Sequence, residues 1–151
     1  MIPGLSFTNL PLDGVFSLAS QMAMVGWLIL TVAPRRWPIF VWLPKFIIPG
    51  ALSALYSLLI ISHFGAADGG FGSLDGVKTL FRNEYVLLAG WVHYLAFDLF
   101  IGAWIAERCD KLGFSRFIQP LFFAATFLFG PMGLLLFFIT SGFYRQRDVS
   151  A

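Results

Sequence analysis

Charged residues are scarce in this chain, and cysteine is scarcer still. Only 12% of the 151 residues are Asp, Glu, Lys or Arg, about half the share found in soluble domains. The single cysteine, Cys109, excludes an internal disulfide and any cysteine cluster. A formal net charge of +2 gives no support to nucleic-acid binding. These absences argue against a soluble domain and against a nucleic-acid partner.

A phosphate-binding motif is also missing. The segment 65–76, GAADGGFGSLDG, is rich in glycine, but Asp75 stands where a GxGxxG motif requires its last glycine. No Lys-Ser or Lys-Thr pair forms a P-loop in this segment. We therefore interpret it as a flexible connection, and no other connection in the chain is long enough to form a soluble domain.

Long apolar runs are what the chain has in abundance. Hydrophobic residues make up 58% of it, and its mean hydropathy is +0.80. The charged residues leave four runs of about the 20 residues that a bilayer core requires, at 12–33, 46–64, 85–106 and 117–140. The runs lack the alternation of barrel strands, so each is predicted to be a helix. The expected fold is an all-α integral membrane protein, a single domain of four transmembrane helices in an antiparallel bundle.

The positively charged residues predict an orientation. Four spans would place both termini on one side, together with four cations, and the loops 34–45 and 107–116 on the other side with six. The six are Arg35, Arg36, Lys45, Arg108, Lys111 and Arg116, and the four are Lys78, Arg82, Arg145 and Arg147. Positive-inside counting then places both loops in the cytoplasm. The first run is too long for a cleaved signal, and a prokaryotic cytoplasmic membrane is the expected location.

Several local signals refine these helices. Asn83 is a predicted N-cap for the third span, after a short amphipathic segment at 77–81. The sequence GPMG at 130–133 predicts a proline kink in the fourth span, because Pro131 cannot donate to the carbonyl of Phe127. Small residues at spacings of three or four predict close helix packing. They are Ala19, Ala23, Gly26, Gly50, Ala54, Gly102 and Ala106.

The third span carries an aspartate where charge is costly. An ionised carboxylate at the centre of a spanning helix costs about 2.5–3.5 kcal/mol on insertion scales, so such residues normally face the bundle interior. At 100° per residue, Trp91 and Tyr94 share a face with Asp98, and Glu84 continues that face at the helix mouth. These four side chains predict one wall of an amphipathic cleft. A purely structural hydrogen bond is the alternative role for Asp98.

Other polar residues fall near this wall. His93 is five residues from Asp98, a rotation of 140°, so the two residues cannot bind one atom but can line adjacent walls or contact different partners. In the first span, Ser17, Ser20 and Gln21 form one polar face and are candidate partners for Asp98 or for a polar ligand. A packing role for His93 is as well supported as a functional one.

Four segments of the chain are similar to those of a known family. They are FSLAS at 16–20, TVAP at 31–34, LFRNEYVLLAGWVHYLAFDLFIG at 80–102 and FGPMGLLL at 129–136. They resemble the abscisic-acid-deficient-four-like family, small neoxanthin-synthase-like membrane proteins whose plant members are needed to make neoxanthin from violaxanthin. The most specific element is W-x-H followed by D-L-F in the third span. The resemblance extends over nearly the whole chain.

The resemblance implies an isomerisation of a xanthophyll within the bilayer. An epoxide opens to a tertiary alcohol while a proton leaves the adjacent polyene carbon, which gives an allene. The reaction consumes no redox equivalent, so no cofactor is expected. Such chemistry requires an acid and a base shielded from water, and we assign these roles to Asp98 and His93. Trp91, Tyr94 and Trp104 are expected to hold the ring and chain of the carotenoid.

The sequence is compatible with two alternatives. The chain can be a non-catalytic carotenoid carrier, or an accessory subunit that presents a carotenoid or another apolar isoprenoid to a partner membrane enzyme. Assembly with a second copy is a related possibility. The other alternative is a haem protein that uses His63 and His93. The first alternative needs the same apolar cleft with polar anchors as an enzyme would.

Overall fold

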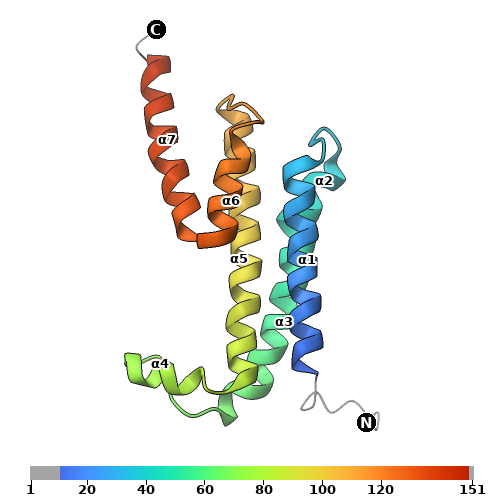
Figure 1. Cartoon of the computed structure of the whole chain (residues 1–151), viewed down its shortest axis with the longest axis vertical. Helices are drawn as coiled ribbons and strands as arrows, with labels where there is room; N and C mark the ends of the chain where they lie inside the picture. Colours follow the sequence, from blue (N-terminus) through green and yellow to red (C-terminus); the bar gives the residue numbers. More distant parts are fainter. Residues whose placement is uncertain (1–10, 150–151) are drawn as a thin grey trace.

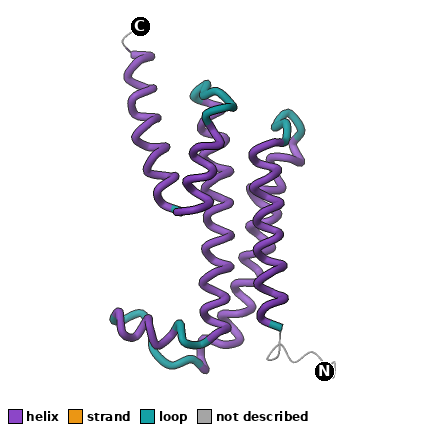
Figure 2. The backbone as a smooth tube through the Cα atoms, viewed as in Figure 1, coloured by secondary structure: helices purple, strands orange, loops and turns teal. Residues whose placement is uncertain are grey.

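The computed structural model describes the backbone of residues 11–149 and the side chains of residues 11–142. This part of the chain is built from helices and contains no strand (Figure 2), which confirms the all-α prediction. The elements are α1 Leu12–Val32, α2 Pro38–Trp42, the π-helical turn η2 Leu43–Ile47, α3 Ile48–His63, the 3₁₀ turn η3 Phe64–Ala66, α4 Leu74–Leu80, α5 Glu84–Lys111, α6 Gln119–Phe129 and α7 Pro131–Val149.

Three helical segments form the core of the molecule and are long and apolar enough to cross a membrane. They are Leu12–Val32, Pro38–Ala66 and Glu84–Lys111. The last of these, α5, packs along both α1 and α3 (Figure 1). Leu52, Val92 and Leu99 are completely buried where these helices meet. The membrane assignment therefore holds for these three segments by length and composition.

Small residues bring these helices together, as most of the spacings predicted. Ala19 and Ala23 of α1 are almost fully buried. A side chain at Gly26 would collide with Leu99 of α5, and one at Gly102 would collide with Trp27 of α1. The prediction is wrong at Gly50, where a side chain would meet no atom within 4 Å. Ala54 is exposed as well, because this face of α3 points away from its neighbours.

The second and third spans are longer than predicted. The helix that contains α3 begins at Pro38, so much of the expected loop 34–45 is helical. The wide turn η2 accommodates Pro44, which has no N–H to donate, and Ile48 donates to the carbonyl of Leu43, five residues earlier. At the other end of the core, α5 continues to Lys111 and shortens the expected loop 107–116.

The fourth predicted span, 117–140, is wrong. The chain reverses at Gly130, so α6 and α7 form a hairpin beside the C-terminal half of α5 and do not form one kinked helix (Figure 1). The apolar parts of the two helices, Gln119–Phe129 and Pro131–Gly142, are each too short to span a bilayer. Within residues 11–149, the architecture is therefore three span-length helices and a hairpin, which corrects the expected four-span bundle.

Glycine and proline explain the reversal. Gly130 has φ +54° and ψ −103°, a conformation that side chains rarely adopt. Pro131 is the first residue of α7, where a missing N–H costs nothing. A side chain at Gly133 would collide with Thr126, so the absence of one lets α7 pack closely against α6. The positive φ of Gly130 distinguishes this reversal from a proline kink within one continuous helix.

The hairpin also changes the predicted topology. The start of α1 and helix α4 lie at one end of the molecule, whereas the α5–α6 loop and the end of α7 lie at the other (Figure 1). Arg145 and Arg147 belong to the C-terminal part of α7, so they join the six cations of the first and third loops and raise that count to eight. Only Lys78 and Arg82 remain at the α4 end. Positive-inside counting predicts more strongly than before that the end with eight cations is cytoplasmic.

Candidate functional site

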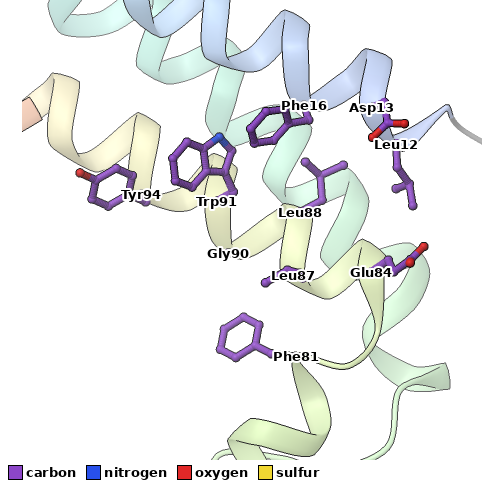
Figure 3. A pocket seen from close by; sticks show the side chains of 10 residues that line it. All are labelled: Leu12, Asp13, Phe16, Phe81, Glu84, Leu87, Leu88, Gly90, Trp91 and Tyr94. Atoms are coloured by element: carbon purple, nitrogen blue, oxygen red, sulfur yellow. The ribbon is translucent and has the colours of Figure 1, made fainter. Parts of the chain in front are cut away.

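An apolar groove of about 990 Å³ follows the N-terminal half of α5, on the side of α1 and α4 (Figure 3). It lies at the upper end of the range of about 300–1,000 Å³ that is usual for small-molecule sites. Most of the side chains that line it are apolar or aromatic. They are Leu12, Asp13, Phe16, Phe81, Glu84, Leu87, Leu88, Gly90, Trp91 and Tyr94.

Helix caps place α4 and α5 around the groove. The Ser73 side chain accepts a hydrogen bond from the Gly76 N–H, 3.0 Å away, and so begins α4. Asn83 begins α5 by accepting from the N–H groups of Tyr85 and Val86 at 3.0 and 3.2 Å, which confirms the predicted N-cap. Between the two caps lies Phe81, whose ring packs against the bare backbone of Gly90 (Figure 3). The turn from α4 to α5 therefore gives the groove one of its walls.

Aromatic rings form the opposite wall. The ring centroids of Phe16 and Trp91 are 5.5 Å apart, with an interplanar angle of 30°. Trp91 in turn lies 5.5 Å from Tyr94, at 29°. The Trp91 indole donates a 3.1 Å hydrogen bond to the hydroxyl of Ser20, which fixes its orientation. A row of rings inclined to one another by only 29–30° suits a flat, conjugated ligand.

At the inner end of the groove, Tyr94 and its neighbour Asp98 contact the α6–α7 hairpin. The Tyr94 hydroxyl donates a 2.9 Å hydrogen bond to the carbonyl of Phe127, the acceptor left free by Pro131. A Cβ atom at Gly130 would lie 3.2 Å from Oδ1 of Asp98 and 3.6 Å from the Tyr94 ring. Oδ2 of Asp98 is buried and has no hydrogen-bond partner among the described residues. Tyr94 and Asp98 thus contact the turn of the hairpin directly.

The structure brings part of the predicted wall together. Glu84, Trp91 and Tyr94 line the groove, and Asp98 lies one helical turn beyond Tyr94, beside the hairpin. Of the predicted polar face of α1, Ser20 supports Trp91. The other two members, Ser17 and Gln21, are exposed, and no contact between this face and Asp98 is found in the described part of the chain.

Two predicted residues lie elsewhere. The exposed His93 ring packs against Tyr56 of α3 at 5.4 Å and against Phe97 at 4.5 Å, away from the groove. Trp104 packs against the α7 rings of Phe137 and Phe138 at 5.6 and 6.1 Å. Neither side chain lines the groove. The acid–base pairing of Asp98 with His93 stays a prediction, and no contact joins the two residues in the described structure.

His63 has an environment that the sequence did not reveal. Its side chain is buried and stacks on Tyr85, with centroids 3.9 Å apart and an interplanar angle of 6°. Its Nδ1 atom is 3.0 Å from the carbonyl of Leu59. His63 therefore packs against Tyr85, whereas His93 packs against Tyr56 and Phe97. No group of three His, Cys, Asp or Glu side chains suited to a metal is found among the described residues.

Sequence reasoning missed the apolar half of the groove. Phe16, Phe81 and Gly90 shape its walls, yet aromatic and small residues are frequent throughout this chain. Only the position of Asp13 in the first turn of α1 gave a signal, because it is an acid at the start of an apolar run. The contribution of α4 depends on a turn between two helices, which no periodicity within one helix reveals.

The opposite end of the molecule holds a dense polar cluster. The Arg35 guanidinium donates to the Asp110 carboxylate and to the Gln119 side-chain carbonyl, both at 2.7 Å, and to the carbonyl of Ala106 at 3.1 Å. Gln119 is fully buried and donates back to Asp110 at 3.0 Å. Burial lowers the pKa of the Arg35 guanidinium from its ordinary value, and the bond to Asp110 opposes this shift. This cluster joins the turn after α1 to α5 and α6.

Together, three helices that are long and apolar enough to span a membrane indicate a membrane-associated protein, and an apolar groove lies beside these helices. Residues 14–137 match the ABA DEFICIENT 4-like family. The match includes most of the chain, so the chain belongs to that family, as its sequence segments predicted. The family relates to carotenoid and abscisic acid metabolism. No curated protein and no solved structure matches the chain.

Proposed function

We propose that this protein isomerises the epoxide-bearing end group of a xanthophyll, in a reaction of the violaxanthin-to-neoxanthin type, with the end group held in the groove. The observation that carries the proposal is the groove itself, which has aromatic walls and ends at Tyr94, one helical turn from Asp98 on the same span-length helix. Membership of a family of carotenoid metabolism supports this ligand class. An elongated apolar molecule can reach such a groove directly from the lipid.

The proposed chemistry uses Asp98 as the acid. Its proton passes to the epoxide oxygen, one C–O bond breaks, and the oxygen remains on the ring as a tertiary alcohol. The adjacent polyene carbon then loses a proton, and the electrons of its C–H bond complete the allene. One proton is gained and one is lost, so no oxidant, reductant or cofactor takes part. The burial of Oδ2 of Asp98 away from water supports this role.

Two residues can act as the base that removes the proton from the polyene carbon. His93 was the predicted base, and in this proposal it acts only if the polyene reaches it from the lipid side, where its ring lies. The carboxyl group of Asp98 offers a second route, because one oxygen can donate a proton while the other accepts one. Replacement of His93 by Phe separates the two routes, since conversion persists only if Asp98 performs both steps.

A second candidate function is non-catalytic binding of a carotenoid. Two observations favour it: the lining of the groove is mostly apolar, and Asp98 lies against the backbone turn at Gly130. In that position a carboxylate near the start of α7 can stabilise the hairpin without any chemical role. A carrier or accessory subunit of another membrane enzyme requires nothing more.

The experiment that tests the proposal is pigment analysis of a host that makes epoxy-xanthophylls, with the wild-type chain, Asp98→Asn and the exposed loop control Asp68→Asn. We expect the wild type and Asp68→Asn to form allenic product. Asp98→Asn is expected to retain bound pigment but to lose conversion by at least about 100-fold, the usual scale for a general acid. Absorption spectra of the purified proteins report pigment binding independently of conversion.

The outcomes separate the two candidates. Unchanged conversion in Asp98→Asn contradicts the assigned acid. Pigment bound by every variant with no conversion by any of them contradicts the isomerase and supports the carrier. A wild-type protein that folds but carries no pigment contradicts both.

A further inference from the structure

Another pocket lies at the opposite end of the molecule from the groove. It has a volume of about 330 Å³ and lies between the end of α1, helix α2 and the C-terminal part of α5 (Figure 1). Part of its lining is apolar, with Leu30 of α1, Phe40 and Val41 of α2, and Ala103 of α5. The rest of its lining is mostly charged. The pocket therefore combines apolar and ionic surfaces, as an amphipathic ligand does.

Two observations place this pocket in the headgroup layer of a membrane. The segment Pro38–Ala66 has 29 residues, which is roughly 44 Å of helix, whereas the hydrocarbon core of a bilayer is about 30 Å thick. The segment is therefore too long to lie wholly in hydrocarbon. Trp37 and Trp42, at the two ends of α2, are exposed, and exposed tryptophan is typical of the membrane–water interface. Lipid headgroups can therefore reach a pocket that α2 lines.

The ionic groups around this pocket carry a surplus of positive charge. Asp110 accepts a hydrogen bond from Arg35 at 2.7 Å, and Glu107 accepts one from Lys111 at 2.8 Å and another from Lys45. Three cations thus face two carboxylates, which leaves a net charge of +1 in this network as the structure describes it. Each lysine ammonium has three N–H donors. Lys111 lines the pocket and its side chain is 63% exposed, so it can serve Glu107 and a ligand together.

A phosphodiester matches this network. It carries one negative charge and has only acceptor oxygens, and arginine and lysine are its usual partners in proteins. The Nη2 atom of Arg35 has two N–H groups, of which the Leu30 carbonyl takes one at 3.3 Å. A headgroup with a cation of its own fits less well, because both carboxylates already have cationic partners. A free phosphate fits less well too, since it makes no use of the apolar lining.

We propose that this pocket binds the phosphodiester headgroup of an anionic phospholipid. Lys111 and Arg35 contact the phosphate, and the first part of an acyl chain lies along Phe40 and Val41. Basic pockets between spanning helices are known to bind anionic headgroups in this way. The bound lipid joins α2 to α5, so it takes part in the assembly of this end of the molecule. The proposal is independent of the function proposed for the groove.

Native mass spectrometry of the purified protein in detergent, titrated with phosphatidylglycerol or phosphatidylcholine, tests this proposal. Both lipids have a phosphodiester and two acyl chains, but phosphatidylcholine also carries a cation. We expect one phosphatidylglycerol molecule to bind at least about fivefold more tightly than phosphatidylcholine, the scale of one unit charge near a lipid surface. Phosphatidylcholine that binds as tightly overturns the assignment of an anionic headgroup.

A pair of charge variants tests the location of the site. Lys111→Met is expected to weaken phosphatidylglycerol binding by about fivefold, because one cation is lost from the pocket. Arg108→Met removes the same charge from the same helix, but Arg108 packs over the Trp104 ring at 5.3 Å and does not line the pocket. We expect this control to change binding by less than about twofold. Equal losses in the two variants overturn the pocket and indicate attraction by surface charge alone.

A pair of tryptophan variants tests the cavity without a change of charge. Val41→Trp is expected to fill the pocket and to remove the preference for phosphatidylglycerol over phosphatidylcholine. Ile39→Trp is the control, because Ile39 belongs to the same helix, is 51% exposed and does not line the pocket. Circular dichroism and size-exclusion chromatography check that both variants fold. A folded Val41→Trp protein that binds phosphatidylglycerol as the wild type does overturns the assigned site.

Inorganic phosphate distinguishes a lipid from a soluble ligand. We expect millimolar phosphate to leave the bound phosphatidylglycerol in place, since phosphate gains nothing from the apolar lining. Release of the lipid by phosphate overturns the lipid assignment and indicates a site for a soluble phosphorylated molecule. Pigment binding and conversion by folded Val41→Trp are expected to equal those of the wild type, because the groove lies at the other end of the molecule (Figure 1).

Discussion

The two ends of this molecule satisfy their polar groups in opposite ways. At the end that holds the α5–α6 loop, Arg35, Asp110 and Gln119 bond to one another, and Arg35 and Asp110 also line a pocket of about 330 Å³. At the α4 end, Asp13 and Glu84 lie beside a groove about three times as large, and no ion pair with either is found among the described residues. One end holds its helices together with charged groups, whereas the other leaves apolar surface open to a ligand.

This difference indicates which end carries function. Most donors and acceptors of the Arg35 cluster are matched to each other and so stabilise an arrangement of helices, and only the Nε atom of Arg35 is buried without a partner within this cluster as the structure describes it. The opposite end has an aromatic lining and an unpartnered carboxylate oxygen near mid-span, which stability alone does not require. We therefore assign assembly to the Arg35 end and recognition to the groove, and three predictions test this division.

The largest expected effect is an all-or-none signal that shows on which side of the membrane the C-terminus and the segment 65–76 lie. A reporter that fluoresces only in the cytoplasm, fused to the C-terminus, is expected to be active. The same reporter inserted into the glycine-rich segment 65–76 is expected to be inactive, because the hairpin puts these two sites at opposite ends (Figure 1). Activity at both sites or at neither contradicts the hairpin and favours four spans.

An intermediate effect is expected from Arg35→Met. The substitution leaves the buried Gln119 carbonyl and the carbonyl of Ala106 without their donor, and it leaves Asp110 without its cation. We expect a loss of about 2–3 kcal/mol in unfolding free energy, less than for a fully buried pair because Asp110 is 39% exposed on its side chain. Unfolding in mixed detergent–SDS micelles measures it.

The exposed neighbour of Arg35 provides the control for this measurement. Arg36→Met is expected to change the unfolding free energy by less than about 0.5 kcal/mol. Pigment binding by Arg35→Met, measured from the absorption spectrum of the folded variant, is expected to remain unchanged. Equal losses in the two arginine variants contradict the role of the cluster in assembly.

The smallest effect is expected from Lys111→Met at the same end. Lys111 pairs with Glu107 one helical turn away at 2.8 Å, but its side chain is 63% exposed. Such pairs contribute little, and Glu107 keeps its second partner, Lys45. We expect a change below about 0.5 kcal/mol in the same unfolding assay. A loss as large as that of Arg35→Met would extend the stabilising cluster to the surface pairs.

The first and third spans were predictable because hydrophobic runs report the length of a helix. The fourth span was not predictable, because a hydrophobic run does not show whether the chain continues in one direction or reverses within the run. Gly130 and Pro131 are compatible with a kink or with a reversal, and the choice depends on groups from another helix. Tyr94 satisfies the Phe127 carbonyl, and Asp98 lies beside the turn. These interactions join residues more than 30 positions apart, so local sequence rules do not contain them.

The site was predictable to the same extent. Helical periodicity predicts that Glu84, Trp91 and Tyr94 share one face of a helix, and all three line the groove from α5. It did not identify Phe16 or Phe81, because their contribution comes from the packing of three different elements. Periodicity gave the angle between His93 and Asp98, but it did not give the neighbour that each faces.

The position of the groove beside span-length helices has a thermodynamic consequence for any ligand. A groove that opens sideways into a bilayer is solvated by acyl chains, so binding is an exchange of one hydrocarbon for another and gains little from the hydrophobic effect. Affinity must then arise from flatness, which the aromatic wall recognises, and from the polar contacts at the inner end. The relevant concentration is the mole fraction of ligand in the membrane, so lipid unsaturation and chain length will act as competitors in every binding measurement.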